Sequence, residues 1–257
     1  MTTRPGFPAR LDTGNAARVR KQPEGHGPSR MAPAAAPQGL GMDSGAPRAR
    51  MVQKLAAQGI ADPQVLQAMA AIERHRFVDS ALVNQAYEDT SLPIGLGQTI
   101  SKPNVVARMM ELLMGAQKEP SGKLGRVLEI GTGCGYQAAL LSLVAREVYS
   151  IERLRGLHDK ARENLRAFRL ANLHLLFGDG MAGYAKGAPY AAIIAAAGGN
   201  AVPQAWIDQL ATGGRIVAPM VTSAGQQALV VIDKTPQGLK QSVLEAVHFV
   251  PLKSGIA

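Results

Sequence analysis

The 257-residue sequence has a single cysteine, Cys134, and no long apolar run. One cysteine excludes an internal disulfide framework and leaves no cysteine cluster for a structural zinc site, as is typical of a reducing compartment. No apolar stretch approaches the roughly 20 residues that a helix needs to cross a bilayer, and no short apolar core follows the first basic residues as in a secretory signal. We therefore expect a cytoplasmic protein that has no membrane partner and binds no metal.

Acidic residues are scarce in the first fifty positions, where eight Lys/Arg stand against three Asp/Glu. This segment carries +5 of the net charge of +9, so the remainder is only mildly basic. Residues 1–48 also contain seven Gly and seven Pro, a composition that does not offset the entropy of ordering. We expect residues 1–48 to be a disordered basic tail without a module for specific nucleic-acid binding. Weak contact with RNA, DNA or acidic surfaces and a cleaved targeting peptide stay open as alternatives.

Helices are expected after the tail. Apolar residues recur at helical spacing from Met51 onward, until a glycine ends the pattern. Asp62 followed by a proline is typical of the N-cap and first position of a second helix. Pro103 opens a third helix with an apolar stripe, whereas residues 73–101 show no regular period. The chain before the glycine-rich loop described below is therefore predicted to be mainly helical.

From residue 125 onward, short apolar runs alternate with helical patterns, which indicates a parallel sheet with helices on both faces. The expected strands are residues 126–130, 148–152, 173–177, 191–197 and 215–219, and the expected helices are 136–145, 154–168 and 203–210. Residues 228–233 and 245–252 have no helix between them, so they are expected to pair antiparallel at the sheet edge. The predicted fold class is α/β with a mostly parallel sheet.

A glycine-rich loop follows the first of these strands. Residues 127–136 read VLEIGTGCGY, a buried strand, a turn and a helix start, as in α/β folds that bring backbone N–H groups close to a ligand. A dinucleotide loop needs glycine at its first, third and sixth positions, and here the last glycine is the fifth residue. The spacing E-x-G-x-G-x-G instead resembles the first motif of class I methyltransferases, which binds S-adenosylmethionine. The resemblance implies cofactor contacts at Glu129, Gly131, Thr132, Gly133 and Gly135.

Two more carboxylates follow the next strands. Glu152 ends the second strand, where an ionised carboxylate can accept hydrogen bonds from both ribose hydroxyls. Asp179, followed by Gly180, comes after the third strand, where an acid in class I methyltransferases faces the adenine amine. Each carboxylate has a plainer interpretation: Glu152 as a surface acid before a helix, Asp179 as a turn residue, and Glu129 as a strand-end acid that stabilises the glycine turn.

Several segments on both sides of the loop resemble one family, the protein-L-isoaspartate O-methyltransferases. They are residues 76–78, 86–89, 92–95 and 97–103 before the loop, and residues 129–137, 150–153, 178–180, 209–215 and 247–252 from the loop onward. The resemblance covers about residues 50–257 and implies a Rossmann-like class I methyltransferase fold. It implies one domain at residues 49–257, with a helical substrate-side segment at 49–123 and a cofactor-binding core at 124–257.

The reaction that this resemblance implies is transfer of a methyl group from S-adenosylmethionine to the α-carboxylate of an isoaspartyl residue in a damaged protein or peptide. A carboxylate with a pKa near 4 is already ionised at neutral pH, so no strong general base is needed. By resemblance Ser101 is the active-site serine, and Thr99 lies beside it at the start of the helix opened by Pro103. The plainer interpretation of Ser101 is a helix cap. The chain is expected to act as a monomer.

The sequence departs from the family pattern at Ala191, where an aspartate usually follows the Pro-Tyr pair of the fourth strand. Ala191 and the long tail leave open, as a first alternative, a non-catalytic S-adenosylmethionine-binding paralogue. The cofactor loop alone would also permit a class I methyltransferase with another substrate. The first would bind cofactor without methylating isoaspartyl peptides.

Overall fold

The structure, a computed structural model, describes residues 45–223 and 225–257. The helices are α1 (Gly45–Ala57), α2 (Pro63–Ala71), α3 (Pro103–Leu113), α4 (Tyr136–Val144), α5 (Arg155–Leu165) and α6 (Gln204–Gln209). The strands are β1 (Leu92–Gly95), β2 (Gln98–Ile100), β3 (Leu124–Ile130), β4 (Ala145–Glu152), β5 (Leu173–Phe177), β6 (Tyr190–Ala195), β7 (Leu210–Val221), β8 (Gln227–Thr235) and β9 (Gly238–Ala246). Short 3-10 helices are η1 (Arg74–Phe77), η2 (Ser80–Gln85), η3 (Arg166–Phe168), η4 (Gly180–Ala182) and η5 (Ala185–Gly187).

The predicted tail lies outside the described residues up to position 44. Its last four positions, 45–48, belong to helix α1. Asp62 is the N-cap of α2, as predicted, and its side chain accepts hydrogen bonds from the backbone of Gln64 and Val65. No helix in the described part of the chain has both the length and the apolar character that a membrane crossing requires.

Seven strands form one sheet in the order β5-β4-β3-β6-β7-β8-β9. The strands from β5 to β7 are parallel to one another, and β7, β8 and β9 pair antiparallel. The predicted fold class, a mostly parallel α/β sheet with an antiparallel pair at its edge, is therefore confirmed. The chain runs outward from β3 to β5 and then returns to β6 on the other side of β3. In such sheets a crevice forms at the carboxyl ends of the strands where the order reverses.

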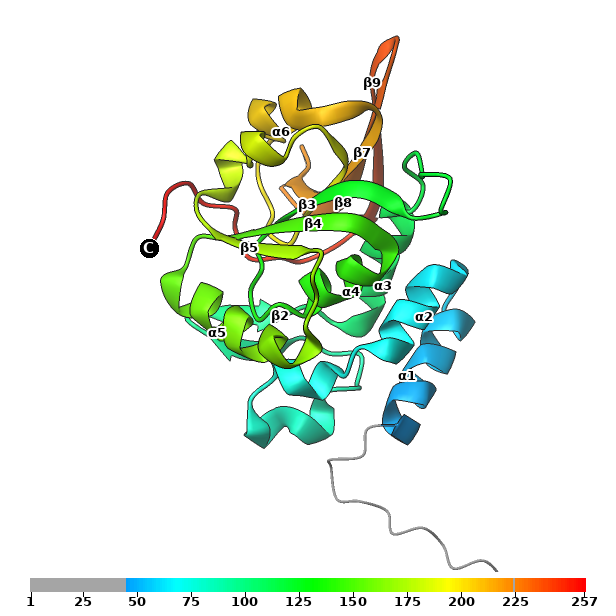
Figure 1. Cartoon of the computed structure of the whole chain (residues 1–257), viewed down its shortest axis with the longest axis vertical. Helices are drawn as coiled ribbons and strands as arrows, with labels where there is room; N and C mark the ends of the chain where they lie inside the picture. The colour runs from blue at the N-terminus through cyan, green and yellow to red at the C-terminus, as the bar shows by residue number, and fades with distance from the viewer. Residues whose placement is uncertain (1–44, 224) are drawn as a thin grey trace, which may run out of the picture. The chain divides into compact units, whose positions relative to one another are not determined.

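Helices cover both faces of this sheet (Figure 1). One apolar cluster packs the five helices α1, α2, α3, α4 and α5 against the sheet face that contains Val127. A second cluster packs α6 against the face that contains Leu128. These two consecutive residues of β3 point to opposite faces because successive strand side chains alternate. Both are fully buried, so the apolar run of β3 belongs to a strand covered on both faces.

Two parts of the chain differ from the prediction. Residues 73–101 contain η1, η2 and the antiparallel pair β1–β2, although no regular structure was expected there. The second difference is that β9 spans Gly238–Ala246, so the predicted strand 245–252 is wrong. Thr235 pairs with Gly238, which leaves a two-residue turn between β8 and β9. Because the turn is this short, the last strand begins earlier in the sequence than predicted, and residues 247–252 lie beyond its end.

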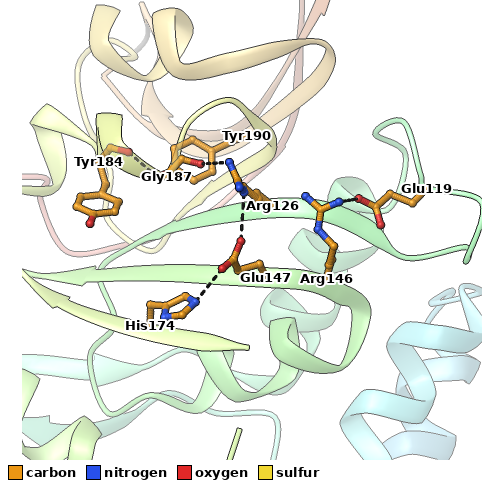
Figure 2. Close-up of polar contacts among 8 residues, drawn as sticks. All are labelled: Glu119, Arg126, Arg146, Glu147, His174, Tyr184, Gly187 and Tyr190. Atoms are coloured by element: carbon orange, nitrogen blue, oxygen red, sulfur yellow. Dashed lines mark hydrogen bonds and ion pairs between the residues drawn. The ribbon is translucent and has the colours of Figure 1, made fainter. Parts of the chain in front are cut away.

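A polar ladder crosses the amino-terminal halves of three parallel strands (Figure 2). Glu147 of β4 accepts a hydrogen bond from Nε of Arg126 in β3 at 3.1 Å, and its other oxygen lies 3.0 Å from Nε2 of His174 in β5. Burial opposes ionisation of Glu147, but hydrogen bonds from Tyr149, His174 and Arg126 together hold its pKa below the usual range. The ladder therefore fixes strand register at the end of the sheet opposite the carboxyl-end crevice.

Candidate active site

A cavity of about 420 Å³ opens at the carboxyl ends of β3 and β4. Its walls come from the β1–β2 hairpin, the loops after β3 and β4, and residues 250–253. Seven of the ten predicted site residues line it: Thr99, Ser101, Gly131, Thr132, Gly133, Glu152 and Gly180. The volume is in the range of cofactor and small-molecule sites. The other three predicted residues, Glu129, Gly135 and Asp179, lie nearby but not on the wall.

The loop after β3 keeps its backbone against the cavity through left-handed glycines. Gly131, Gly133 and Gly135 have φ angles of 90°, 57° and 92°, a region that side chains rarely adopt. The backbone N–H of Gly133 donates to Oε2 of Glu152 at 2.9 Å. Oε1 of the same carboxylate accepts from the backbone of Leu154 at 2.9 Å. Glu152 thus joins the glycine loop to the start of α5 while lining the cavity.

Gly135 lies on the side of the loop that packs against α5. A Cβ at this position would lie 2.7 Å from Cδ1 of Leu165 in α5, closer than any normal contact. The absent side chain lets α5 pack against the start of α4, which fixes the direction in which α4 leaves the loop. Gly135 therefore lets α5 pack closely against the loop, and its contact with the cofactor stays a prediction.

Gly135→Ala should lower the free energy of unfolding by about 2–4 kcal/mol, because backbone strain and overpacking add. Gly59→Ala is the matched control, since Gly59 has a φ of 100° with nothing within 4 Å of an added Cβ. Gly59→Ala should lower the free energy of unfolding only by the strain contribution, about 1 kcal/mol. Urea denaturation of both variants measures the difference, and equal losses would show that contact with Leu165 does not matter.

Glu129 lies one layer behind the cavity wall. It is fully buried, and its Oε2 accepts a hydrogen bond from Oγ of Ser150 at 2.5 Å. Oγ of Ser150 also lies 2.6 Å from Oγ1 of Thr132, which lines the cavity. Burial is the main cause that raises the pKa of Glu129 to about 8. Ser150 was not predicted as a site residue, although it is the register partner of Glu129 in the parallel pair β3–β4.

Asp179 binds backbone rather than facing the cavity. Its Oδ1 accepts from the backbone of Met181 at 2.8 Å, which is the turn role that was the plainer interpretation. Its Oδ2 accepts from the backbone of Gly255 at 2.7 Å. Asp179 thereby ties the end of the described chain to the loop after β5.

Residues 247–257, which we call the C-terminal strap, cross the carboxyl ends of the strands. The strap exchanges backbone hydrogen bonds with Gly198 after β6, and its Ala257 donates to the carbonyl of Arg153 after β4. Nε of Arg153 also donates to the carbonyl of Gly255 at 2.9 Å. Because residues 250–253 line the cavity, the strap supplies a wall that the motif analysis did not assign to the cofactor site.

A second cavity of about 410 Å³ adjoins the first. The two share Thr99, Ser101, Ala196 and Val250, so Ser101 and Thr99 lie on the common wall. The N-cap of α3 is Lys102 rather than Ser101, which removes the helix-cap interpretation of the serine. Neither hydroxyl group has a hydrogen-bond partner within the part of the chain that the structure describes, so both are available to a ligand in either cavity.

Two contacts away from the cavity wall position the serine segment and were not predicted. Oδ1 of Asp89 accepts a hydrogen bond from the backbone of Asn104 at 2.9 Å, which caps the first turn of α3. The fully buried Arg74 donates from Nε to the carbonyl of Ala86 at 2.8 Å and lies over the ring of Tyr136, 5.0 Å from its centroid. Burial lowers the pKa of this guanidinium. Arg74 therefore connects the segment before Ser101 to the helix that follows the glycine loop.

Ala191 lies near the start of β6, whereas Ala196 and Ala197 after that strand line the first cavity. The residue that departs from the family pattern is therefore at the end of the strand away from the cavity. Its small side chain removes no group from the cavity wall. The described residues also contain no cluster of three metal-ligating side chains.

Residues 46–257 match the family model of Protein-L-isoaspartate(D-aspartate) O-methyltransferase (PCMT). The protein-L-isoaspartate O-methyltransferase of Methylibium petroleiphilum is 57% identical over 261 residues, which cover 98% of this chain and 96% of that protein. The Leptothrix cholodnii protein of the same name is 61% identical over 219 residues, covering 84% of this chain and 77% of that protein.

Solved structures give the same family name. One protein-L-isoaspartate O-methyltransferase superposes with a TM-score of 0.72 at 28% identity, covering 81% of this chain and 67% of that chain. A Plasmodium falciparum structure described as a protein-L-isoaspartate O-methyltransferase in complex with S-adenosyl-L-homocysteine gives a TM-score of 0.68. At 22% identity, with 80% of this chain and 98% of that chain covered, it supports the fold alone.

Proposed function

Because this chain belongs to the protein-L-isoaspartate(D-aspartate) O-methyltransferase family, we propose that it transfers a methyl group from S-adenosylmethionine to the α-carboxylate of L-isoaspartyl residues in damaged proteins. The observation that carries the proposal is the pair of adjoining cavities, which meet at Ser101 and Thr99. A cofactor in the first cavity and a peptide carboxylate in the second would face each other across these hydroxyls.

The first cavity fits the cofactor in its size and in the backbone groups that its wall presents. Left-handed glycines bring main-chain groups to the wall, and Gly180 lets the loop after β5 approach the end of β3, since a Cβ at this position would lie 2.5 Å from Cγ2 of Ile130. S-adenosylmethionine, when bound, supplies a methyl group on a positively charged sulfur. We assign Glu152 to the ribose hydroxyls, and Gly131, Thr132 and Gly133 to the walls around the amino-acid end. Asp179 acts on the cofactor site indirectly, through the hydrogen bond that it accepts from Gly255 of the strap.

The second cavity is assigned to the peptide. Ser101 and Thr99 hold the substrate carboxylate by hydrogen bonds from their hydroxyls, which are stronger to an ionised acceptor. The N-terminus of α3, which begins at Pro103, adds partial positive charge beside the carboxylate. No base is required, because the carboxylate is ionised at neutral pH. The residues therefore contribute orientation and exclusion of water rather than proton transfer.

Methyl transfer to a synthetic isoaspartyl peptide, compared with its aspartyl twin, tests the proposal. Ser101→Ala should lower kcat/KM for the isoaspartyl peptide by about 10- to 100-fold, the effect of losing one hydrogen bond to a charged group. Ser223→Ala, outside both cavities, is the control and should match the wild type. Cofactor binding without transfer to either peptide would instead favour the non-catalytic alternative.

We also propose that one copy of residues 49–257 holds the whole activity and works as a monomer in the cytoplasm. The family match begins at residue 46, and the residues that line the two cavities all lie between positions 91 and 253. A protein that begins at Gly45, so that α1 is complete, should bind cofactor and methylate the isoaspartyl peptide like the full chain. Loss of transfer in this shorter protein would assign residues 1–44 a part in activity.

A further inference from the structure

Glu129 is a buried carboxyl group that the proposed methyl transfer does not use. Apart from the hydrogen bond from Ser150, its oxygens are poorly satisfied, since Oε1 has no hydrogen-bond partner among the described residues. No ion pair in the described part of the chain includes it. An unpaired ionised carboxylate is costly in such surroundings, so the neutral acid is the favoured form.

The groups around Glu129 agree with a neutral acid. From β4, Ser150 favours the ionised form, and so does Gln137 from α4, while the carboxylate of Glu152 opposes it. From β6 the register partner is Ile194, which carries no charge. No cation contributes from any of these elements, so burial remains the largest effect on this group.

Three side chains connect this acid to the first cavity. Oγ of Ser150 lies 2.5 Å from Glu129 and 2.6 Å from Oγ1 of Thr132, and Thr132 lines the cavity wall. No apolar side chain interrupts this chain of oxygen atoms. A positive charge placed in the cavity would therefore act on Glu129 through two polarisable hydroxyl groups, and a nearby opposite charge favours the ionised form of an acid.

We propose that Glu129 is protonated while the cavity holds no cation and loses its proton to solvent when a positively charged ligand binds, so that cofactor binding is linked to proton release. Only the O–H bond of Glu129 breaks, and the buffer takes the proton. The inference rests on the proposed function, because S-adenosylmethionine brings two cations, the ammonium of its amino-acid end and the sulfonium, whereas the product S-adenosyl-L-homocysteine keeps only the ammonium. After transfer the sulfonium charge is gone, so Glu129 is protonated to a greater extent than with the cofactor bound. Glu129 is thus a positioning residue that favours the dication over the product through the sulfonium charge.

Isothermal titration calorimetry in two buffers of different ionisation enthalpy counts the protons released on binding. At pH 7, the full chain should release about 0.5–1 more proton with S-adenosylmethionine than Glu129→Gln does. With S-adenosyl-L-homocysteine, which lacks the sulfonium, the difference in count between the wild type and the variant should be smaller than with S-adenosylmethionine. The ligand's own amino group titrates equally in both proteins, so the difference belongs to Glu129. Equal proton counts for S-adenosylmethionine in the two proteins would overturn the inference.

A second measurement needs only the wild type. Its Kd for S-adenosylmethionine should fall by up to about tenfold from pH 6 to pH 7 relative to its Kd for S-adenosyl-L-homocysteine, because proton release becomes easier as pH rises. A constant ratio of the two Kd values would contradict the linkage even if Glu129→Gln did not fold. If the protein transfers methyl groups but the ratio of the two Kd values is constant with pH, only the proton linkage is contradicted and the proposed function stands. If the protein does not bind S-adenosylmethionine at all, the proposed function is contradicted.

Discussion

Trp206→Ala should lower the free energy of unfolding by about 3–5 kcal/mol, the usual cost of emptying a fully buried aromatic site. Trp206 is the only tryptophan of the chain and is completely buried in the cluster beneath α6. Its Nε1 also donates to the carbonyl of Gly180 at 2.8 Å. The substitution therefore removes both packing and the bond that fixes a residue of the cavity wall. Urea denaturation followed by circular dichroism measures the loss.

Trp206→Phe separates these two contributions. Phenylalanine keeps most of the apolar volume but cannot donate to Gly180, so it should lose about 1–3 kcal/mol, which includes one unsatisfied buried carbonyl. It should also weaken cofactor binding through the displaced loop. If Trp206→Phe were as unstable as Trp206→Ala, the hydrogen bond to Gly180 would dominate and the packing estimate would be wrong.

Glu152→Ala should weaken cofactor binding about 100-fold or more. The carboxylate holds the backbone of Gly133 and Leu154 and, in the proposed function, accepts the ribose hydroxyls. Removing it leaves buried donors without partners, and each hydrogen bond to a charged group is worth about 1.5–3 kcal/mol. Because Trp206 bonds to Gly180 on the cavity wall, its fluorescence provides a direct titration signal.

Glu147→Gln is the matched control for Glu152→Ala. Glu147 is also a carboxylate of β4, but it is half-buried, whereas Glu152 is buried, and it belongs to the polar ladder at the opposite end of the strand. Its substitution should leave the Kd for cofactor within about twofold of the wild type. An equal loss of affinity in the two variants would show that the effect comes from strand β4 as a whole rather than from the cavity.

Much of the fold could be predicted because the central strands are buried on both faces. Such strands read as continuous apolar runs, and the predicted range 126–130 lies within β3, which is buried at all but one of its positions. The β1–β2 hairpin was missed because its strands have four and three residues, too few to show a period.

The predicted last strand was placed too late for a different reason. Strand β9 is exposed along most of its length, so its sequence lacks the apolar pattern of a buried strand. Residues 247–252 do have an apolar pattern, but they use it in the strap, where Phe249 is buried and Val250 to Leu252 line the cavity. An apolar run in the sequence indicates that a segment is buried, but it does not indicate whether that segment is a strand or an irregular segment such as the strap.

The candidate site was predictable where its residues follow one another in the chain. The glycine loop and Glu152 could be located because a strand end and its loop form a local motif. Ser150, Arg74 and Asp89 could not, since each acts through a partner whose distance is set only by the folded chain. Asp179 shows the same limit, because its carboxylate binds Gly255, which is 76 positions later in the sequence.

The C-terminal strap determines when the protein first becomes able to hold its cofactor during synthesis. The chain emerges from the ribosome amino-terminal end first, so the glycine loop and Glu152 are available long before the strap. Arg153 bonds to Gly255 across 102 positions, and residues 250–253 form one side of the cavity. A nascent chain can therefore pair β3 and β4 but cannot close the site around a ligand. Closure of the site around a ligand therefore waits until the strap has folded back across the carboxyl ends of the strands.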